Sequence, residues 1–131
     1  MAQQSSDIDP LARSAALAIA GARLGIGIAA FGFTRRALPL VGIDEPGSSA
    51  VAFARMAGGR DLALGMHALA AAGDRDRLRE ATLIGALVDV GDAIAFGAGF
   101  RGTGEARRVA IRNAPLGVAA AIAGAWILSR L

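Results

Sequence analysis

Long apolar stretches separated by short polar connections organise this sequence. Four of them are equal in length, and they cover residues 11–33, 50–72, 78–100 and 109–131. At about 1.5 Å per residue, a helix of this length reaches roughly 34 Å, slightly more than the hydrocarbon thickness of a bilayer, about 30 Å. The pattern predicts an all-α fold, a bundle of four transmembrane helices.

Turn-forming and helix-capping residues mark the expected helix ends. They predict helices at about residues 10–33, 48–73, 75–100 and 105–131 in a single membrane domain covering residues 1–131. The expected starts are Asp9 with Pro10, the pair Ser48 and Ser49, Asp74 or Asp76, and Thr103 or Gly104. The short turn near Gly73 makes the second and third helices antiparallel neighbours. Four crossings place both termini on one side of the membrane.

Composition supports the membrane class. Hydrophobic residues make up 54% of the chain, and the mean hydropathy is +0.49. Many of the apolar residues are Ala, and Gly is also frequent, which suits close helix packing in a membrane. A soluble helical bundle is the alternative, because 19% of the residues are charged. Such a bundle would show broad charged helix faces, whereas these segments carry single charges in apolar surroundings.

The basic residues are 14 arginines without a lysine, and the chain has no cysteine. The arginines are scattered, so the clustered basic face that binds nucleic acid is missing. Five arginines flank the spans on each side, and the even number of spans then favours cytoplasmic termini in a bacterial inner membrane. Without cysteine, disulfides and thiolate chemistry are excluded.

Five charged residues fall at the same depth in three of the expected spans. Counted from the face where the first and third spans end, they lie nine to twelve residues deep; they are Arg23, Arg60, Asp61, Asp89 and Asp92. Unpaired charges at that depth are costly, so we expect these side chains to meet inside the bundle. Asp89 and Asp92 share a helix face and can point at one partner, Arg60 or Arg23. The formal charge of the five is −1, and Arg55 would bring it to zero.

These residues are the candidates for chemistry. Asp89 and Asp92, with Asp61 beside them, are the candidate acid and base, and Arg23, Arg55 and Arg60 are candidate ligand-binding residues. His67, a further candidate ligand-binding residue, follows Arg60 by seven residues, about 20° around the helix, so we expect it on the same stripe. A single histidine lacks the ligand spacing of a metal site, and no motif indicates a cofactor.

The segments that carry these charges resemble a known group of proteins. Over residues 12–130 the chain is similar to short four-span bacterial membrane proteins of unknown function, which are loosely DoxX-like. The resemblance rests on a pattern carried here by Arg55, Gly59, Arg60, Asp61, Asp89 and Asp92. It implies the four-span fold and a role for the charged residues, and no particular reaction.

Several functions are compatible with a polar cluster in the membrane. The leading hypothesis is a polar site that binds a membrane lipid or lipophilic small molecule, or converts it by acid/base chemistry. The alternatives are a non-catalytic subunit that assembles with a second copy or another membrane protein, and a small homodimeric proton-coupled transporter. The ion pairs could also serve only to fix the helix register. Enzymatic and non-enzymatic roles both stay open at this stage.

Overall fold

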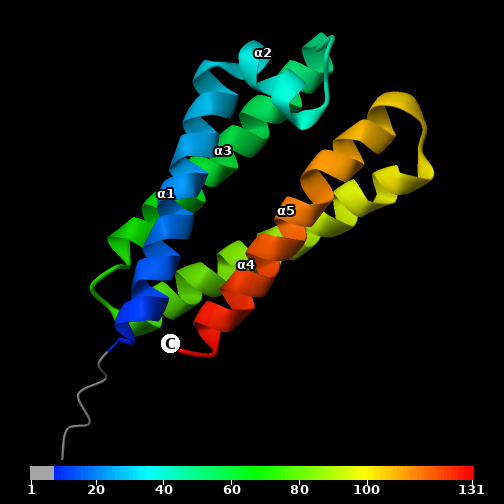
Figure 1. Ribbon diagram of the computed structural model, residues 1–131. Helices are drawn as coiled ribbons and strands as arrows, with labels where there is room; N and C mark the ends of the chain where they lie inside the picture. Colours follow the sequence, from blue (N-terminus) through cyan, green and yellow to red (C-terminus); the bar gives the residue numbers. More distant parts are fainter. Residues whose placement is uncertain (1–7) are drawn as a thin grey trace, which may run out of the picture.

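The computed structural model describes residues 8–131 and confirms the all-helical fold (Figure 1). No strand occurs within this range. The helices are α1 (Pro10–Gly32), α2 (Thr34–Ala37), α3 (Ser48–Ala70), α4 (Arg75–Ala98) and α5 (Gly104–Leu128), with short 3-10 helices η1 (Leu38–Val41) and η2 (Gly99–Arg101). The four long helices coincide closely with the four predicted ones, and they differ mainly in ending slightly earlier.

Most of the predicted helix starts are confirmed. The Asp9 carboxylate accepts hydrogen bonds from the backbone N–H groups of Leu11 and Ala12. Asp74 caps α4 by accepting from the backbone N–H of Arg77. The prediction that the Ser48 and Ser49 pair caps α3 is wrong, because extended Gly47 is the N-cap and Ser48 already lies in the first turn. No side chain therefore caps this helix.

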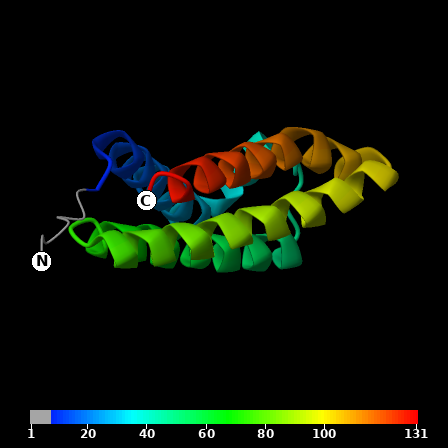
Figure 2. The same ribbon diagram turned by 90° about the horizontal axis from the view of Figure 1, so that it is seen from below.

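The four long helices form two antiparallel hairpins, α1 with α3 and α4 with α5 (Figures 1 and 2). Glycine permits the close approach within each hairpin. A Cβ at Gly27 of α1 would lie 2.8 Å from the carbonyl oxygen of Gly58 in α3. A Cβ at Gly124 of α5 would lie 2.8 Å from the Cβ of Ala86 in α4. Contacts between the two hairpins are sparser, although α3 and α4 are neighbours as predicted.

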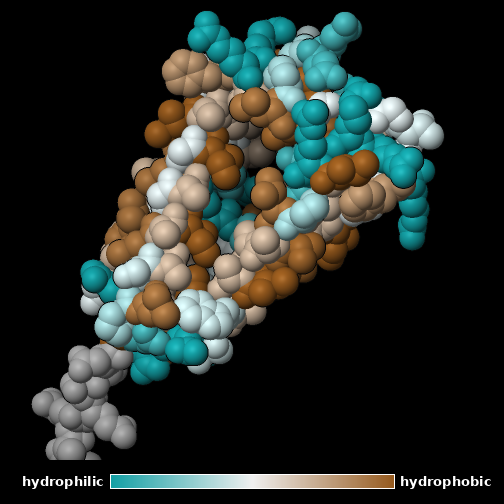
Figure 3. Space-filling model, in the orientation of Figure 1, coloured by the Kyte–Doolittle hydropathy of each residue, from teal (hydrophilic) through white to brown (hydrophobic). Residues whose placement is uncertain are grey.

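Side-chain size is distributed in the opposite way to that of a soluble protein. The buried hydrophobic residues are mostly alanines, and among large side chains only Leu78 and Ile127 are fully buried within the described range. Large apolar side chains such as Phe53, Ile94 and Ile122 are 69%, 70% and 64% exposed. In Figure 3 the hydrophobic residues cover the flanks, and the hydrophilic ones gather at the two ends of the bundle. This distribution is typical of a surface that faces lipid.

Three of the long helices, α1, α4 extended by η2, and α5, are long and apolar enough to cross a membrane. The exception is α3, although its length of 23 residues is sufficient. Any stretch of α3 long enough to span includes Arg55, Arg60 and Asp61, whereas each of the other three helices contains a stretch of that length with no more than two charged residues. Length and composition thus support three of the four expected spans.

Both described ends of the chain lie at the same end of the bundle. Arg130 lies 3.6 Å from the Asp9 carboxylate, and Ala12, Leu78 and Ile127 form a small apolar core beside this pair. Backbone N–H groups of Leu11 and Ala12 lower the pKa of the Asp9 carboxyl, and the positive charge of Arg130 adds to this effect. The first turn of α1 is therefore held against the last turn of α5.

The connection between α1 and α3 closes the opposite end. Asn113 of α5 donates a hydrogen bond to the carbonyl oxygen of Val41, and Arg112 donates one to that of Pro39. Gly42 follows η1 with a φ of 100°, and a Cβ there would lie 3.2 Å from the backbone nitrogen of Val109. Only glycine suits both the left-handed backbone and the close approach. This connection is an ordered segment that attaches the first hairpin to the second.

We expect the substitution Asn113→Ala to destabilise the protein by about 1–2 kcal/mol, because the carbonyl of Val41 loses a largely buried donor. Hydrogen exchange of residues 34–47 in detergent should speed up, while exchange at the opposite end of the bundle stays unchanged. Thr103→Ala is a suitable control, since the exposed Thr103 side chain makes no capping hydrogen bond. Equal exchange in both variants would show that Asn113 does not hold the connection.

Candidate functional site

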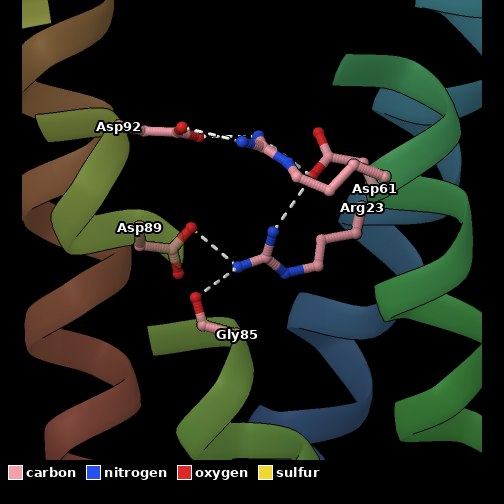
Figure 4. Close-up of polar contacts among 6 residues, drawn as sticks. Arg23, Asp61, Gly85, Asp89 and Asp92 are labelled. Atoms are coloured by element: carbon pink, nitrogen blue, oxygen red, sulfur yellow. Dashed lines mark hydrogen bonds and ion pairs between the residues drawn. The ribbon is translucent and has the colours of Figure 1, made fainter. Parts of the chain in front are cut away.

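Midway along the long helices, five charged side chains from α1, α3 and α4 form one connected network (Figure 4). We call Arg23, Arg60, Asp61, Asp89 and Asp92 the Arg/Asp network. The structure thus brings together the five residues that the depth count selected. The fourth long helix, α5, contributes no charged residue to it.

Arg23 is the most deeply placed arginine of the network and joins three helices. One terminal nitrogen donates to Asp61 Oδ1 of α3 at 3.1 Å, and the other donates to Asp89 Oδ1 of α4 at 2.7 Å. The second nitrogen also donates to the carbonyl oxygen of Gly85 at 3.1 Å. Arg23, Asp61 and Asp89 are all buried. One guanidinium therefore serves two buried carboxylates.

Arg60 pairs with a different carboxylate, nearer the edge of the bundle. Its two terminal nitrogens donate to the two oxygens of Asp92 at 2.8 and 2.7 Å, a bidentate geometry that favours strong pairing. The Arg60 and Asp92 side chains are 37% and 30% exposed. The expectation that Asp89 and Asp92 point at one arginine is wrong, because each has its own. Asp92 lies one turn further along α4, where both it and its partner Arg60 are partly exposed.

The network connects the two hairpins. In Figure 4, Asp92 lies above Asp89 on one side, Asp61 lies on the other side, and the Arg23 guanidinium bonds to both Asp89 and Asp61. Asp61 Oδ1 lies 3.6 Å from a terminal nitrogen of Arg60 in addition to its bond from Arg23. The first hairpin contributes two arginines and one aspartate, a formal charge of +1, and the second contributes two aspartates, −2. Electrostatic attraction therefore operates across the boundary where helix contacts are fewest.

Two predicted ligand-binding residues lie outside the network. Arg55 is exposed near the start of α3 and donates to the Thr34 hydroxyl at 3.4 Å, so it does not neutralise the network. His67 is exposed and takes no part in the network. The buried face of α3 runs through Gly58, Asp61 and Gly65, and His67 lies about 120° from Asp61 around the helix. The expectation was wrong because Arg60 stands at the edge of that face.

A cavity of about 30 Å³ lies between the four long helices beside Arg23 and Asp89. Its other walls include Thr82, Gly85 and Gly124. The volume is sufficient for one or two water molecules, whereas ligand pockets for small molecules have about 300 Å³ or more. The part of the network that is exposed to a larger molecule includes Arg60 and Asp92. Figure 3 shows a hollow between the hairpins with hydrophilic side chains at its floor.

Sequence reasoning missed Gly85 as a site residue. It lies four residues before Asp89, one turn along the same face of α4, so its carbonyl and the Asp89 carboxylate reach the same guanidinium. A Cβ at Gly85 would lie 3.4 Å from the terminal nitrogen of Arg23. The signal in the sequence was a small residue at i−4 from a buried aspartate.

The network offers carboxylates and guanidinium groups, which can bind polar groups and transfer protons. Within residues 8–131, no group of three or more His, Asp or Glu side chains is arranged to hold a metal ion. No family model matches the chain, and comparison with curated proteins and with solved structures finds no match.

Proposed function

We propose that the chain is a four-span protein of the bacterial inner membrane, with α3 as the fourth span. The two charged residues midway along α3 support this assignment, because Asp61 is buried in the bundle and Arg60 is half-buried against Asp92. The exposed side of the same helix carries large apolar residues, among them Phe53 and Met66. The resemblance to short four-span, loosely DoxX-like proteins is compatible with this arrangement. Both termini then share one side of the membrane.

The distribution of arginines bears on the orientation. Arg55 and Arg112 both bond to the connection between α1 and α3, at Thr34 and Pro39. They join Arg35, Arg36, Arg101, Arg107 and Arg108 at that end, which gives seven arginines, against five at the other end: Arg13, Arg75, Arg77, Arg79 and Arg130. The excess favours a cytoplasmic location for the connection. The proposed orientation is therefore opposite to that expected from an even number of spans.

Single-cysteine labelling tests the span number and the orientation together, because the natural chain contains no cysteine. Cysteine at Gly47 or Gly102 should be protected from a membrane-impermeant maleimide in intact spheroplasts and labelled after lysis. Cysteine at Gly73 or Ser129 should react before lysis. The reverse pattern would overturn the orientation and keep the four spans, whereas Gly47 and Gly73 on the same side would overturn the four-span topology.

The function that we propose is binding of a lipophilic small molecule through its polar group at the Arg60–Asp92 edge. One observation carries it: a partly exposed ion pair lies midway along helices whose outer surface is apolar. Exposed charge at that depth is costly in lipid, and the oxygen of a bound molecule can compensate for part of the missing hydration. In a catalytic form of this function, Asp92, Asp89 and Asp61 would exchange protons, and Arg60 would align the substrate.

Co-purification tests this proposal. Protein extracted with native lipid should carry a lipophilic compound that mass spectrometry identifies, and Asp92→Asn or Arg60→Gln should lose it. Asp44→Asn is the matched control, because Asp44 pairs with Arg108 at an exposed site at the end of the bundle. Identical extracts from the wild type and all three variants would contradict the proposed site.

A second candidate is assembly with another membrane protein, and the free face of α1 favours it. Gly21, Gly25 and Gly32 recur at spacings of four and seven residues on this face, and a Cβ at any of them would meet nothing within 4 Å. Such faces allow membrane helices to approach closely. Chemical crosslinking in native membranes should then give a species larger than the monomer. Monomer alone would count against this candidate.

A further inference from the structure

The number of charges in the Arg/Asp network does not balance. Two guanidinium groups, Arg23 and Arg60, face three carboxylates, Asp61, Asp89 and Asp92, which leaves a formal charge of −1. Arg55 does not compensate for it, because its side chain bonds to Thr34 near the end of the bundle. In the part of the network that the helices bury, a carboxylate without a positive partner is unfavourable. A buried carboxyl group without such a partner takes up a proton instead.

The contacts show which of the three carboxylates carries the unmatched negative charge. Both oxygens of Asp92 accept from Arg60, so this carboxylate is fully matched. Arg23 is shared by Asp61 and Asp89, and Asp61 has Arg60 as a second positive neighbour at 3.6 Å. Asp89 has Arg23 alone, and its hydrogen bond falls on Oδ1, which leaves Oδ2 to accept a proton (Figure 4). Asp89 is therefore the least compensated of the three carboxylates.

A cavity large enough for a water molecule lies beside Asp89. The cavity of about 30 Å³ is bordered by Asp89 and Arg23, but not by Asp61 or Asp92. A water molecule there can carry a proton to Asp89 Oδ2 as hydronium: one O–H bond of the hydronium breaks, one O–H bond forms at Oδ2, and a neutral water molecule is left to receive the proton again. The faces of α3 and α5 that border the cavity contribute no titratable group; on α3 they are Leu64 and Ala68, and on α5 Ala120, Gly124 and Ile127.

We propose that Asp89 is a proton-binding site, at which the network holds one exchangeable proton that is supplied through the water-sized cavity. Protonation leaves a neutral network of two arginines and two ionised aspartates. It also weakens the Arg23–Asp89 bond, a contact between the two hairpins. This site rests on the proposed function, which places the network in the membrane. It deepens that function because it supplies the proton that acid/base chemistry or coupled transport requires.

Infrared spectroscopy of the purified wild type in lipid tests this assignment. A protonated carboxylic acid has a C=O stretching band that carboxylates lack, and the band of a solvent-connected group moves in D₂O. We expect this band at neutral pH, its loss in Asp89→Asn, and an altered frequency in Asp89→Glu. Asp74→Asn, at an exposed turn, should leave the band unchanged.

Other outcomes overturn the proposal. A wild-type spectrum with no such band at neutral pH means that all three aspartates are ionised, and this result needs no variant that could misfold. A band that moves in Asp61→Glu but not in Asp89→Glu places the proton on Asp61 instead of Asp89. The infrared measurement uses no ligand, so its outcome does not depend on the co-purification experiment. A failure of the proposed membrane topology would be seen separately, in the cysteine labelling.

Discussion

Replacing Arg23 by methionine is expected to destabilise the protein by about 3–5 kcal/mol, the usual cost of removing one partner from a buried ion pair. The substitution removes the donor of Asp61 and Asp89, which are each 8% exposed, and of the Gly85 carbonyl. It also leaves three carboxylates with a single arginine. The free energy of unfolding, measured by SDS titration of the protein in mixed micelles, checks this expectation.

Two further variants separate the charge effect from the change in shape. Arg13→Met alters the same helix, but Arg13 donates only to the exposed carbonyl of Ala72, so a loss below about 1 kcal/mol is expected. The triple variant Arg23→Met, Asp61→Asn, Asp89→Asn removes the whole buried group of charges. It should recover most of the lost stability, because replacing a buried ion pair completely is often nearly neutral. If the triple variant is as unstable as Arg23→Met, packing around the arginine stem dominates.

The sequence predicted the parts of this structure that follow from periodicity and length. The four long apolar stretches correspond to α1, α3, α4 and α5, because each helix needs the same length to match its neighbours in the bundle. Depth counting also selected the five network residues, since antiparallel helices of equal length bring residues of equal depth together. Asp9 and Asp74 could be recognised because their capping hydrogen bonds reach only two or three residues along the chain.

The details of the site depend on how the helices are rotated about their axes, and the sequence determines this rotation poorly. Whether Arg23 or Arg60 meets Asp89 depends on how far each hairpin turns about its own axis. His67 illustrates the limit: its predicted angular offset from Arg60 is small, but Arg60 itself lies at the edge of the buried face, and His67 falls outside it. Arg55 was assigned to the network by charge balance, and its bond to Thr34 shows that local polar partners can compete with a distant cluster.

Apolar packing and charge stabilise different contacts in this structure. Small residues allow the helices of each hairpin to approach closely, which favours dispersion contacts in lipid, where burial of apolar surface contributes little. Between the hairpins, where such contacts are fewer, the Arg/Asp network and the connection to Val41 and Pro39 supply polar attraction. A change in the protonation of the network would therefore act mainly on the relative position of the hairpins.

Packing within the first hairpin can be tested with two glycines of one helix. Gly27→Ala places a Cβ 2.7 Å from Leu62 Cγ and 2.8 Å from the Gly58 carbonyl oxygen, and a backbone atom has little freedom to move away. We expect a loss of about 1–3 kcal/mol, the usual cost of overpacking a close-packed interface. Gly25→Ala should be neutral or should stabilise the helix by up to about 1 kcal/mol, because its Cβ meets nothing within 4 Å.

The contrast between these two variants carries more information than either value alone. Helix propensity changes equally in both, so their difference in unfolding free energy isolates the contact between α1 and α3. Equal values would mean that the helices separate at this point in the folded protein.

Gly25→Ala adds a second observation: if it leaves the stability of the monomer unchanged but abolishes a crosslinked dimer in membranes, the free face of α1 is an interface between copies. If the crosslinked species persists, that face is exposed to lipid, and its glycines are not needed for assembly.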